Sequence, residues 1–537
     1  MKFMGHAFGF LATAGIGILW LTSLPMALAE TLADIDQDIQ SNKTFRTERG
    51  DLDAYNIYEG VTDDRLERKI NLLQEAGINS RFYQTGTGAR DFTNFYSFTG
   101  EVGVTDTKLD LVTTNSILRL YRRGSSGYQE ASGYLGSWWG DRYRGIGESR
   151  DQQAILAAWG SDLQRIYVID VPVGKTLVGG LAAPMERDGE YRSGGAYQYY
   201  YRGALSSWLV YALYAPDYLK SYSGAVTGAQ KAGRSLATDL GLHLEQTRHG
   251  AVNDPDSEAA RTAERYGELW LRGFGSDLDY SEIDGSSGNA QTGGVSIGWQ
   301  RMITGQNAAD QSRAYWGLML GQSTNEQQYE ISNVENSARA TVGGMYALYI
   351  DSPESPRSWY GNCSLLYGGL SHHNTVPGEL GYGLSQDYTG DIMILTVENG
   401  ISFRHKNGWS IEPQLQFSYA RIGQSDFNDN LGALVSLQQG DALWGRLGME
   451  VRKTLNNTGM LQSSFWTRLS AVRDFSARNE VSVAGDLAVS ELEQNSFLLA
   501  VGTDLKINQR WSLHGQLAEV FDGERGLQGN LALKYAW

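Results

Sequence analysis

The feature that most constrains this fold is a two-residue alternation of apolar and polar side chains in the C-terminal half. In the stretch WSIEPQLQFSYA, every second residue from Trp409 to Tyr419 is apolar, and the residues between are Ser, Glu or Gln. The segment from Leu527 to Trp537 repeats the pattern. Because successive side chains of a strand point to opposite faces, each segment is expected to form a strand with one apolar and one polar face.

About twelve such segments follow one another, separated by polar turns such as HKNG and FDGERG. Aromatic residues stand near the strand ends, as in the interfacial girdles of outer-membrane barrels; they include Trp409, Tyr419, Trp511 and Trp537. A soluble sandwich also alternates, but it seldom places its aromatics opposite so many Gln, Ser and Asn residues. The pattern predicts a twelve-stranded antiparallel transmembrane β-barrel over residues 265–537.

A helix is expected immediately before the barrel. The segment SGAVTGAQKAGRSLATDLGLHLEQTRHG places Leu236, Leu240 and Leu244 on one helical face, and Gly250 is a candidate stop. The remaining faces are small or polar, which suits a helix threaded through a polar lumen, and an ordinary surface helix is the alternative. Residues 223–264 are assigned to this helix and a linker.

The C-terminal half resembles the translocator domain of autotransporters, the type V secretion family. The resemblance is carried by the opening RYGELWLRGFG, the internal GRLGMEVRKTL and the aromatic chain end after LALKY. It implies a barrel in outer-membrane lipid that depends on the barrel-assembly machinery. It also implies an N-terminal passenger that is displayed at the cell surface or released.

The N-terminus has the pattern of a secretion signal over residues 1–29. Lys2 precedes an apolar stretch, and Ala27-Leu28-Ala29 matches a leader-peptidase site. An uncleaved membrane anchor is the alternative. No later run approaches the roughly 18 apolar residues of a membrane helix. The net charge of −16 argues against nucleic acid as a partner.

Residues 30–222 are expected to form an α+β passenger domain. The segments DDRLERKINLLQEA and SRDQQAILAAWGS have helical periodicity, and LRLYRRG, RIYVIDVPVG, TLVGGLAAP and AYQYYYRG are typical of strands. No internal repeat is present, unlike in β-helical passengers. All seven histidines and the single cysteine lie outside this region, which excludes histidine-dependent nucleophiles and His- or Cys-ligated zinc there.

Cleavage of the nicotinamide N-glycosidic bond of NAD needs no histidine. Such an enzyme holds the pyrophosphate, for which Arg is suited, stacks the nicotinamide on aromatic rings and stabilises an oxocarbenium-like transition state. NAD is therefore a candidate substrate, and neither a metal nor a required cofactor is expected. The candidate binding residues are Arg122, Arg123, Trp138, Trp139, Gly194, Gly195 and Tyr199.

The region resembles the ADP-ribosyltransferase superfamily, and within it the necrotizing-toxin-type NAD glycohydrolases. The matching elements are GLAAP (180–184) and GGAYQY (194–199). The resemblance implies that Gln198 takes the catalytic position where transferases carry Glu, and that Arg122 holds the NAD phosphates. The family's histidine is absent and MERDGEYRS is inserted, while the lack of a Glu-x-Glu pair favours hydrolysis over transfer. A non-enzymatic adhesin or binding module is the alternative passenger, and the long helix argues against a barrel that acts alone as a porin.

Overall fold

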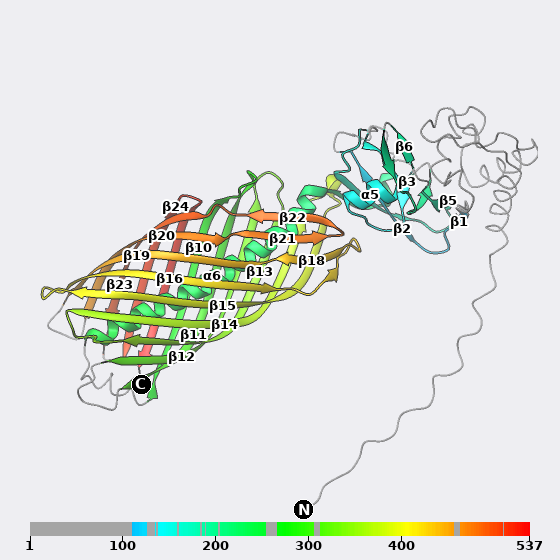
Figure 1. Ribbon diagram of the computed structural model, residues 1–537. Helices are drawn as coiled ribbons and strands as arrows, with labels where there is room; N and C mark the ends of the chain where they lie inside the picture. The colour runs from blue at the N-terminus through cyan, green and yellow to red at the C-terminus, as the bar shows by residue number, and fades with distance from the viewer. Residues whose placement is uncertain are drawn as a thin grey trace, which may run out of the picture.

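The computed structural model describes residues 110–125, 135, 138–157, 160–182, 185–187, 189–201, 204–253, 266–304, 312–455, 462–508 and 510–536. These residues form a long barrel with a helix inside it and a smaller sheet domain at one end (Figure 1). The predicted signal segment 1–29, the predicted helix over 63–76 and Trp537 lie outside the described residues.

The predicted twelve-stranded antiparallel barrel is confirmed, and it closes where its first strand pairs with its last. The strands are β10 (Glu268–Ser281), β11 (Ser287–Thr304), β12 (Arg313–Tyr329), β13 (Glu335–Ile350), β14 (Arg357–Val376), β15 (Leu384–Arg404), β16 (Trp409–Gly423), β19 (Asp441–Leu455), β20 (Gln462–Ser476), β23 (Asn495–Lys506), β24 (Trp511–Phe521) and β25 (Glu524–Ala536). Closure leaves no unpaired sheet edge, which is the condition for a sheet to span lipid.

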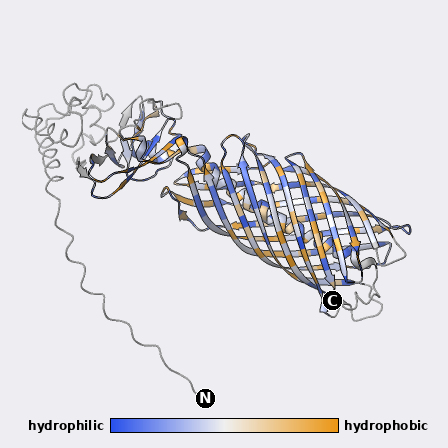
Figure 2. Cartoon of the chain, turned by 180° about the vertical axis from the view of Figure 1, so that it is seen from behind, coloured by the Kyte–Doolittle hydropathy of each residue, from blue (hydrophilic) through white to orange (hydrophobic). Residues whose placement is uncertain are grey.

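The two faces of each barrel strand differ as the alternation predicted. On β16 the outward Ile411 and Phe417 are each 48% exposed, whereas the inward Glu412 and Gln414 are 1% and 2% exposed. Hydrophobic and hydrophilic residues alternate along the barrel strands seen in Figure 2. The apolar side chains therefore face lipid, and the polar side chains face the lumen.

A helix fills the lumen, as the sequence indicated. Helix α6 (Ala215–Asn253) runs along the barrel interior, and Leu236, Leu240 and Leu244 are fully buried there. It begins at Ala215, before the predicted helix start at 223, and continues past the predicted stop at Gly250 to Asn253. Its first turns are held by tertiary contacts of buried tyrosines, which outweigh weak local helix propensity.

Two hairpins extend the barrel wall at the end that carries the sheet domain (Figure 1). Strands β17 (Phe427–Asn428), β18 (Leu434–Gln439), β21 (Arg478–Val483) and β22 (Asp486–Glu491) form a separate four-stranded sheet there. A short 3₁₀ turn, η3 (Glu379–Gly381), connects β14 to β15. The C-terminus lies at the opposite end of the barrel (Figure 1).

The N-terminal domain is built on a seven-stranded antiparallel sheet with the order β1-β5-β8-β3-β2-β4-β9. Its strands are β1 (Asp110–Thr113), β5 (Thr176–Leu181), β8 (Tyr197–Tyr200), β3 (Trp138–Gly140), β2 (Leu118–Gly124), β4 (Arg165–Val171) and β9 (Leu209–Tyr214). A small hairpin, β6 (Met185–Arg187) with β7 (Glu190–Arg192), and a 3₁₀ turn, η2 (Ser206–Trp208), complete it.

The predicted helix at SRDQQAILAAWGS is wrong in its extent. Helix α5 spans only Ile146–Gln152, and Ala154 adopts a positive φ of 53°. The chain leaves the helix there because the carbonyl groups of Asp151 and Gln152 accept hydrogen bonds from Gly194 and Ala196. Contacts from a distant segment thus end a helix that local periodicity would have extended.

Candidate functional site in the charged lumen

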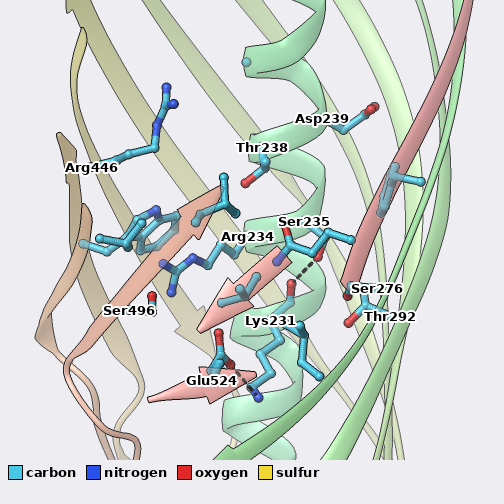
Figure 3. Close-up of a pocket in the computed structure, with 18 of the residues that line it drawn as sticks. Lys231, Arg234, Ser235, Thr238, Asp239, Ser276, Thr292, Arg446, Ser496 and Glu524 are labelled. Atoms are coloured by element: carbon cyan, nitrogen blue, oxygen red, sulfur yellow. Dashed lines mark hydrogen bonds and ion pairs between the residues drawn. The ribbon is translucent and has the colours of Figure 1, made fainter. Parts of the chain in front are cut away.

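A cavity of about 170 Å³ lies between α6 and the barrel wall. Figure 3 shows its lining, in which Lys231, Arg234, Thr238 and Asp239 project from the helix and Arg446 and Glu524 from the wall. The cavity is large enough for several water molecules and is lined with charged and polar groups, so it is suited to hold water. The lumen is therefore a polar interior with room for water between the helix and part of the wall.

Charged side chains in the middle of α6 pair with the barrel wall around this cavity. Lys231 Nζ lies 2.9 Å from a Glu524 oxygen, and Arg234 pairs with Asp474 at 3.1 Å. A buried pair is stabilising only when its geometry and hydrogen bonds offset the loss of hydration. These contacts fix both the depth and the rotation of α6 in the lumen.

Asp239 joins the helix to the place where the barrel closes. Its carboxylate accepts hydrogen bonds from Arg272 Nε at 2.9 Å, from the Ser296 hydroxyl and from Asn530 Nδ2 at 2.5 Å. These three partners lie on β10, β11 and β25, which include the first and last barrel strands. One helix carboxylate therefore ties together the seam of the barrel.

A second network of charged side chains surrounds the C-terminal part of α6. Glu245 accepts hydrogen bonds from Arg468 and, at 3.4 Å, from Arg452, and all three side chains are almost fully buried. One turn further, Arg248 pairs with Glu412 and lies 3.6 Å over the ring of Tyr360. Each buried charge has an opposite charge beside it, which lowers the cost of burial.

One group among the described residues has the composition of a metal site. Ligand atoms of Glu245, His249 and Glu450 all lie within 4.8 Å of one another. The carboxylates of this trio are already paired with guanidinium groups, since Arg452 lies 2.9 Å from Glu450 and Arg468 contacts Glu245. Their charge is balanced within the chain, and the group is part of the network that holds α6.

The structure divides the predicted NAD-binding residues between two faces of the N-terminal sheet. Trp139 pairs with Tyr199 across β3 and β8, and Gly140 pairs with Gln198. Since Tyr121 also pairs with Gly140, the next residue, Arg122, lies on the face of Trp139 and Tyr199. Arg123, Trp138 and Gln198 lie on the other face, so the predicted residues do not converge on one ligand.

Trp139 and Arg122 also differ from the predicted roles in their surroundings. Trp139 is 1% exposed and packs in a cluster with Leu120 and Tyr167, so its ring is a core side chain and not an open stacking surface. Arg122 donates from its guanidinium to the carbonyl oxygen of Leu135.

Arg123 is buried and serves the interface with the barrel. Its guanidinium donates to the carbonyl oxygens of Arg144 and Leu163, to the hydroxyl of Tyr143 and to Asp486 of the barrel at 2.9 Å. Burial raises the pKa of the Tyr143 hydroxyl above its usual range, so that hydroxyl stays neutral. With its donors committed in this way, Arg123 holds two parts of the chain together.

Gln198 is 6% exposed, and its Nε2 donates to the carbonyl oxygen of Gln153 at 3.0 Å. Gly194 and Gly195 have positive φ values of 68° and 93°, which explains glycine at both positions of this turn. Ser193 donates from its N–H and its hydroxyl to Asp151, and these bonds lower the pKa of that carboxyl group. The GGxxQ segment therefore binds the C-terminal end of α5.

Sequence reasoning missed two arginines that lie near Gln153. A cavity of about 10 Å³, room for about one water molecule, is lined by side chains that include Arg142, Arg144 and Gln153. Arg142 is half exposed and pairs with Glu148, and Arg144 is buried beside Asp141 at 2.7 Å. The segment DRYRG carried a signal in its two closely spaced arginines, but nothing in it indicated their partners.

The lumen charges were missed as a group, although their positions carried a signal. Several lumen-facing positions of the barrel strands carry charged residues, although an uncharged polar residue such as Ser, Asn or Gln would give the same alternation of polar and apolar side chains. These charged residues include Arg272, Glu412, Glu450, Arg452 and Arg468. A fully buried position that retains a charge indicates a charged partner. The partner helix could be inferred from this, but the pairing could not.

Comparisons with known proteins agree with this architecture. The family model described as Autotransporter beta-domain matches residues 269–518. The pertactin autotransporter of Bordetella parapertussis is 24% identical over 267 residues, which are 48% of this chain and 28% of pertactin. The probable autotransporter YcgV of Escherichia coli is 22% identical over 259 residues, which are 47% of this chain and 26% of YcgV.

Among solved structures, the β domain of the Bordetella autotransporter BrkA aligns over 50% of this chain and 99% of that domain, with 18% identity and a TM-score of 0.41. The chain spans less than a third of the length of the curated relatives it matches. No helix within the described ranges is long and apolar enough to cross a membrane. Residues 269–518 thus match the β-domain of autotransporters, the translocator unit of type V secretion, and the barrel lies in the outer membrane with the N-terminal domain at the cell surface.

Proposed function

We propose that the barrel exports the N-terminal part of its own chain and then retains it at the cell surface. The observation that carries this proposal is the direct continuation of the N-terminal sheet into the lumen helix. Strand β9 ends at Tyr214, and α6 begins at the next residue, Ala215. The charged contacts of α6 in the lumen therefore also anchor the domain above it.

Contacts at the mouth of the barrel favour retention over release. Arg165 of β4 pairs with Glu379 of η3, and the N–H of Ala212 donates to the carbonyl oxygen of Tyr382 at 2.9 Å. The second bond occupies the outer edge of β9, an edge strand that would otherwise be open to other chains. The domain is thus fixed to the barrel by its helix and by loop contacts.

The test uses the full-length protein expressed in a Gram-negative host. Protease added to intact cells is expected to digest the N-terminal domain while α6 and the barrel remain, and the culture medium is expected to contain no free domain. A variant without residues 1–29 provides the control for export. An N-terminal fragment in the medium, or full protection of that domain on intact cells, would contradict the proposal.

A second candidate function concerns the N-terminal domain, which we propose cleaves the N-glycosidic bond of NAD. The supporting observation is the concentration of Arg123, Arg142 and Arg144 around the small cavity beside Gln153. Guanidinium groups suit phosphate oxygens, and the exposed Arg142 is the member that is accessible to a ligand. The amide of Gln198 binds the Gln153 carbonyl, so catalysis would require it to exchange that partner for ribose or water.

Purified full-length protein is expected to consume NAD, and Gln198→Ala is expected to lower the rate about a hundredfold, as when one oriented hydrogen-bonding group is lost from an active site. Arg142→Ala is expected to weaken NAD binding. Arg119→Ala is the matched control, because Arg119 lies on the same sheet and pairs with Asp170. NAD that stays intact at high protein concentration would refute this function and leave the adhesin or binding module.

A further inference from the structure

The N-terminal sheet shares its core with the barrel. Ile166, Val168 and Leu213, on one face of the sheet, belong to the same continuous cluster of buried apolar side chains as Val481 and Val483 of the β21 hairpin. The opposite face has a separate cluster that includes Leu120 and Trp139. The apolar cluster on this face of the sheet is therefore continuous with the one that includes the β21–β22 hairpin.

Helix α5 also depends on the barrel at its N-terminal end. Its N-cap residue, Gly145, has no side chain to cap the helix. Instead, the N–H of Ile146 donates to both carboxylate oxygens of Asp486, at 2.8 and 3.0 Å. The same carboxylate pairs with Arg123. A helix as short as α5 is not stable by itself, so a cap from the β21–β22 hairpin contributes strongly to it.

The C-terminal end of α5 holds the segment that contains Gln198. The carbonyl oxygens of Asp151 and Gln152 accept hydrogen bonds from Gly194 and Ala196, each at 2.9 Å. The carbonyl oxygen of Gln153 accepts the bond from the Gln198 amide. A continuous series of contacts thus runs from the barrel hairpin through α5 to the turn that carries Gln198.

We infer that the β21–β22 hairpin is a built-in folding template, and that the N-terminal domain completes its fold only when it docks on the barrel at the outer surface. Before docking, α5 lacks the Asp486 carboxylate at its N-terminal end, and the apolar cluster of the sheet is not joined to that of the barrel. Any site built on residues 193–198 is then unformed during export. The inference rests on the proposed export and retention, but it does not depend on what the domain binds or cleaves.

Hydrogen–deuterium exchange of the full-length protein, folded in detergent micelles, tests this template. Asp486→Ala is expected to speed exchange at least about tenfold in peptides covering α5 and residues 193–198, because the cap is lost and Arg123 is left buried without its counter-ion. Exchange in the barrel strands is expected to stay unchanged. Only preparations whose barrel is folded are compared, as judged by the faster migration of the unheated protein in gel electrophoresis.

Two further variants separate the template from a general effect of the hairpin. Asp486→Asn keeps an oxygen for the Ile146 N–H but loses the charge, so an intermediate exchange rate is expected. Glu480→Gln removes a carboxylate of the same hairpin that pairs with Arg478, and wild-type exchange is expected. Wild-type exchange of α5 in Asp486→Ala, or equal acceleration in Glu480→Gln, would overturn the inference. The protein is folded in micelles without being exported, so a negative exchange result would contradict the template and leave the export proposal untouched.

Discussion

Replacing Asp239 with alanine is expected to weaken the closure of the barrel strongly. Asp239 is 1% exposed and binds partners on three strands around the β10–β25 seam. Its removal leaves the buried guanidinium of Arg272 without its opposite charge. Breaking one side of a buried pair costs about 3–5 kcal/mol, and a loss of that size in the free energy of unfolding is expected.

The measurement is the temperature at which the folded electrophoretic form of the barrel is lost. A double variant, Asp239→Ala with Arg272→Met, is the matched control, because removing both partners of a buried pair costs much less than removing one. The double variant is expected to recover most of the lost stability. A single variant that melts with the wild type would show that Asp239 does not hold the seam.

Replacing Glu245 with alanine is expected to weaken the contacts of the C-terminal part of α6 with the barrel wall and to let ions through the lumen. Glu245 pairs with Arg452 and Arg468, so its loss removes the charged contact of the helix with both guanidinium groups and leaves Arg468 with Glu450 at 4.0 Å. The cavity of about 170 Å³ beside α6 already leaves space for water along part of the lumen. Removing one partner of this buried ion pair is expected to destabilise the helix in the lumen by about 3–5 kcal/mol.

Conductance of purified protein in planar lipid bilayers measures this effect directly. The Glu245→Ala variant is expected to show larger and longer openings than the wild type. Thr238→Ala is the matched control, since Thr238 lines the same cavity on the same helix. Wild-type conductance in Glu245→Ala would mean that other contacts suffice to keep the helix seated.

The strongest sequence predictions were those with a repeating local signal. The alternation around Trp409–Tyr419 predicted which side chains face lipid, and the leucines at 236, 240 and 244 predicted the lumen helix. Both predictions succeeded because the same spacing of apolar residues recurs many times along each strand or helix. The start of α6 was misplaced because Tyr218 and Tyr222 stabilise it through Asp429 of the barrel, a contact without a local signal.

The candidate site was predictable only in its residue types. Short motifs placed Arg122, Trp139 and Gln198 in one functional group, but strand register puts Gln198 on the face opposite the other two. A register is set by pairing between distant segments, and a shift of one residue reverses the face of every side chain. A single sequence therefore could not decide whether these residues meet.

The sequence by itself determined the barrel, its lipid-facing surface and the helix that precedes it, because these follow from periodicities of two and of 3.6 residues. Only the tertiary structure decided how the lumen charges pair, where the N-terminal domain ends and what Gln198 touches. The pair of Arg123 with Asp486 joins residues 363 positions apart. Such contacts depend on how elements pack after they form, and no local pattern encodes them.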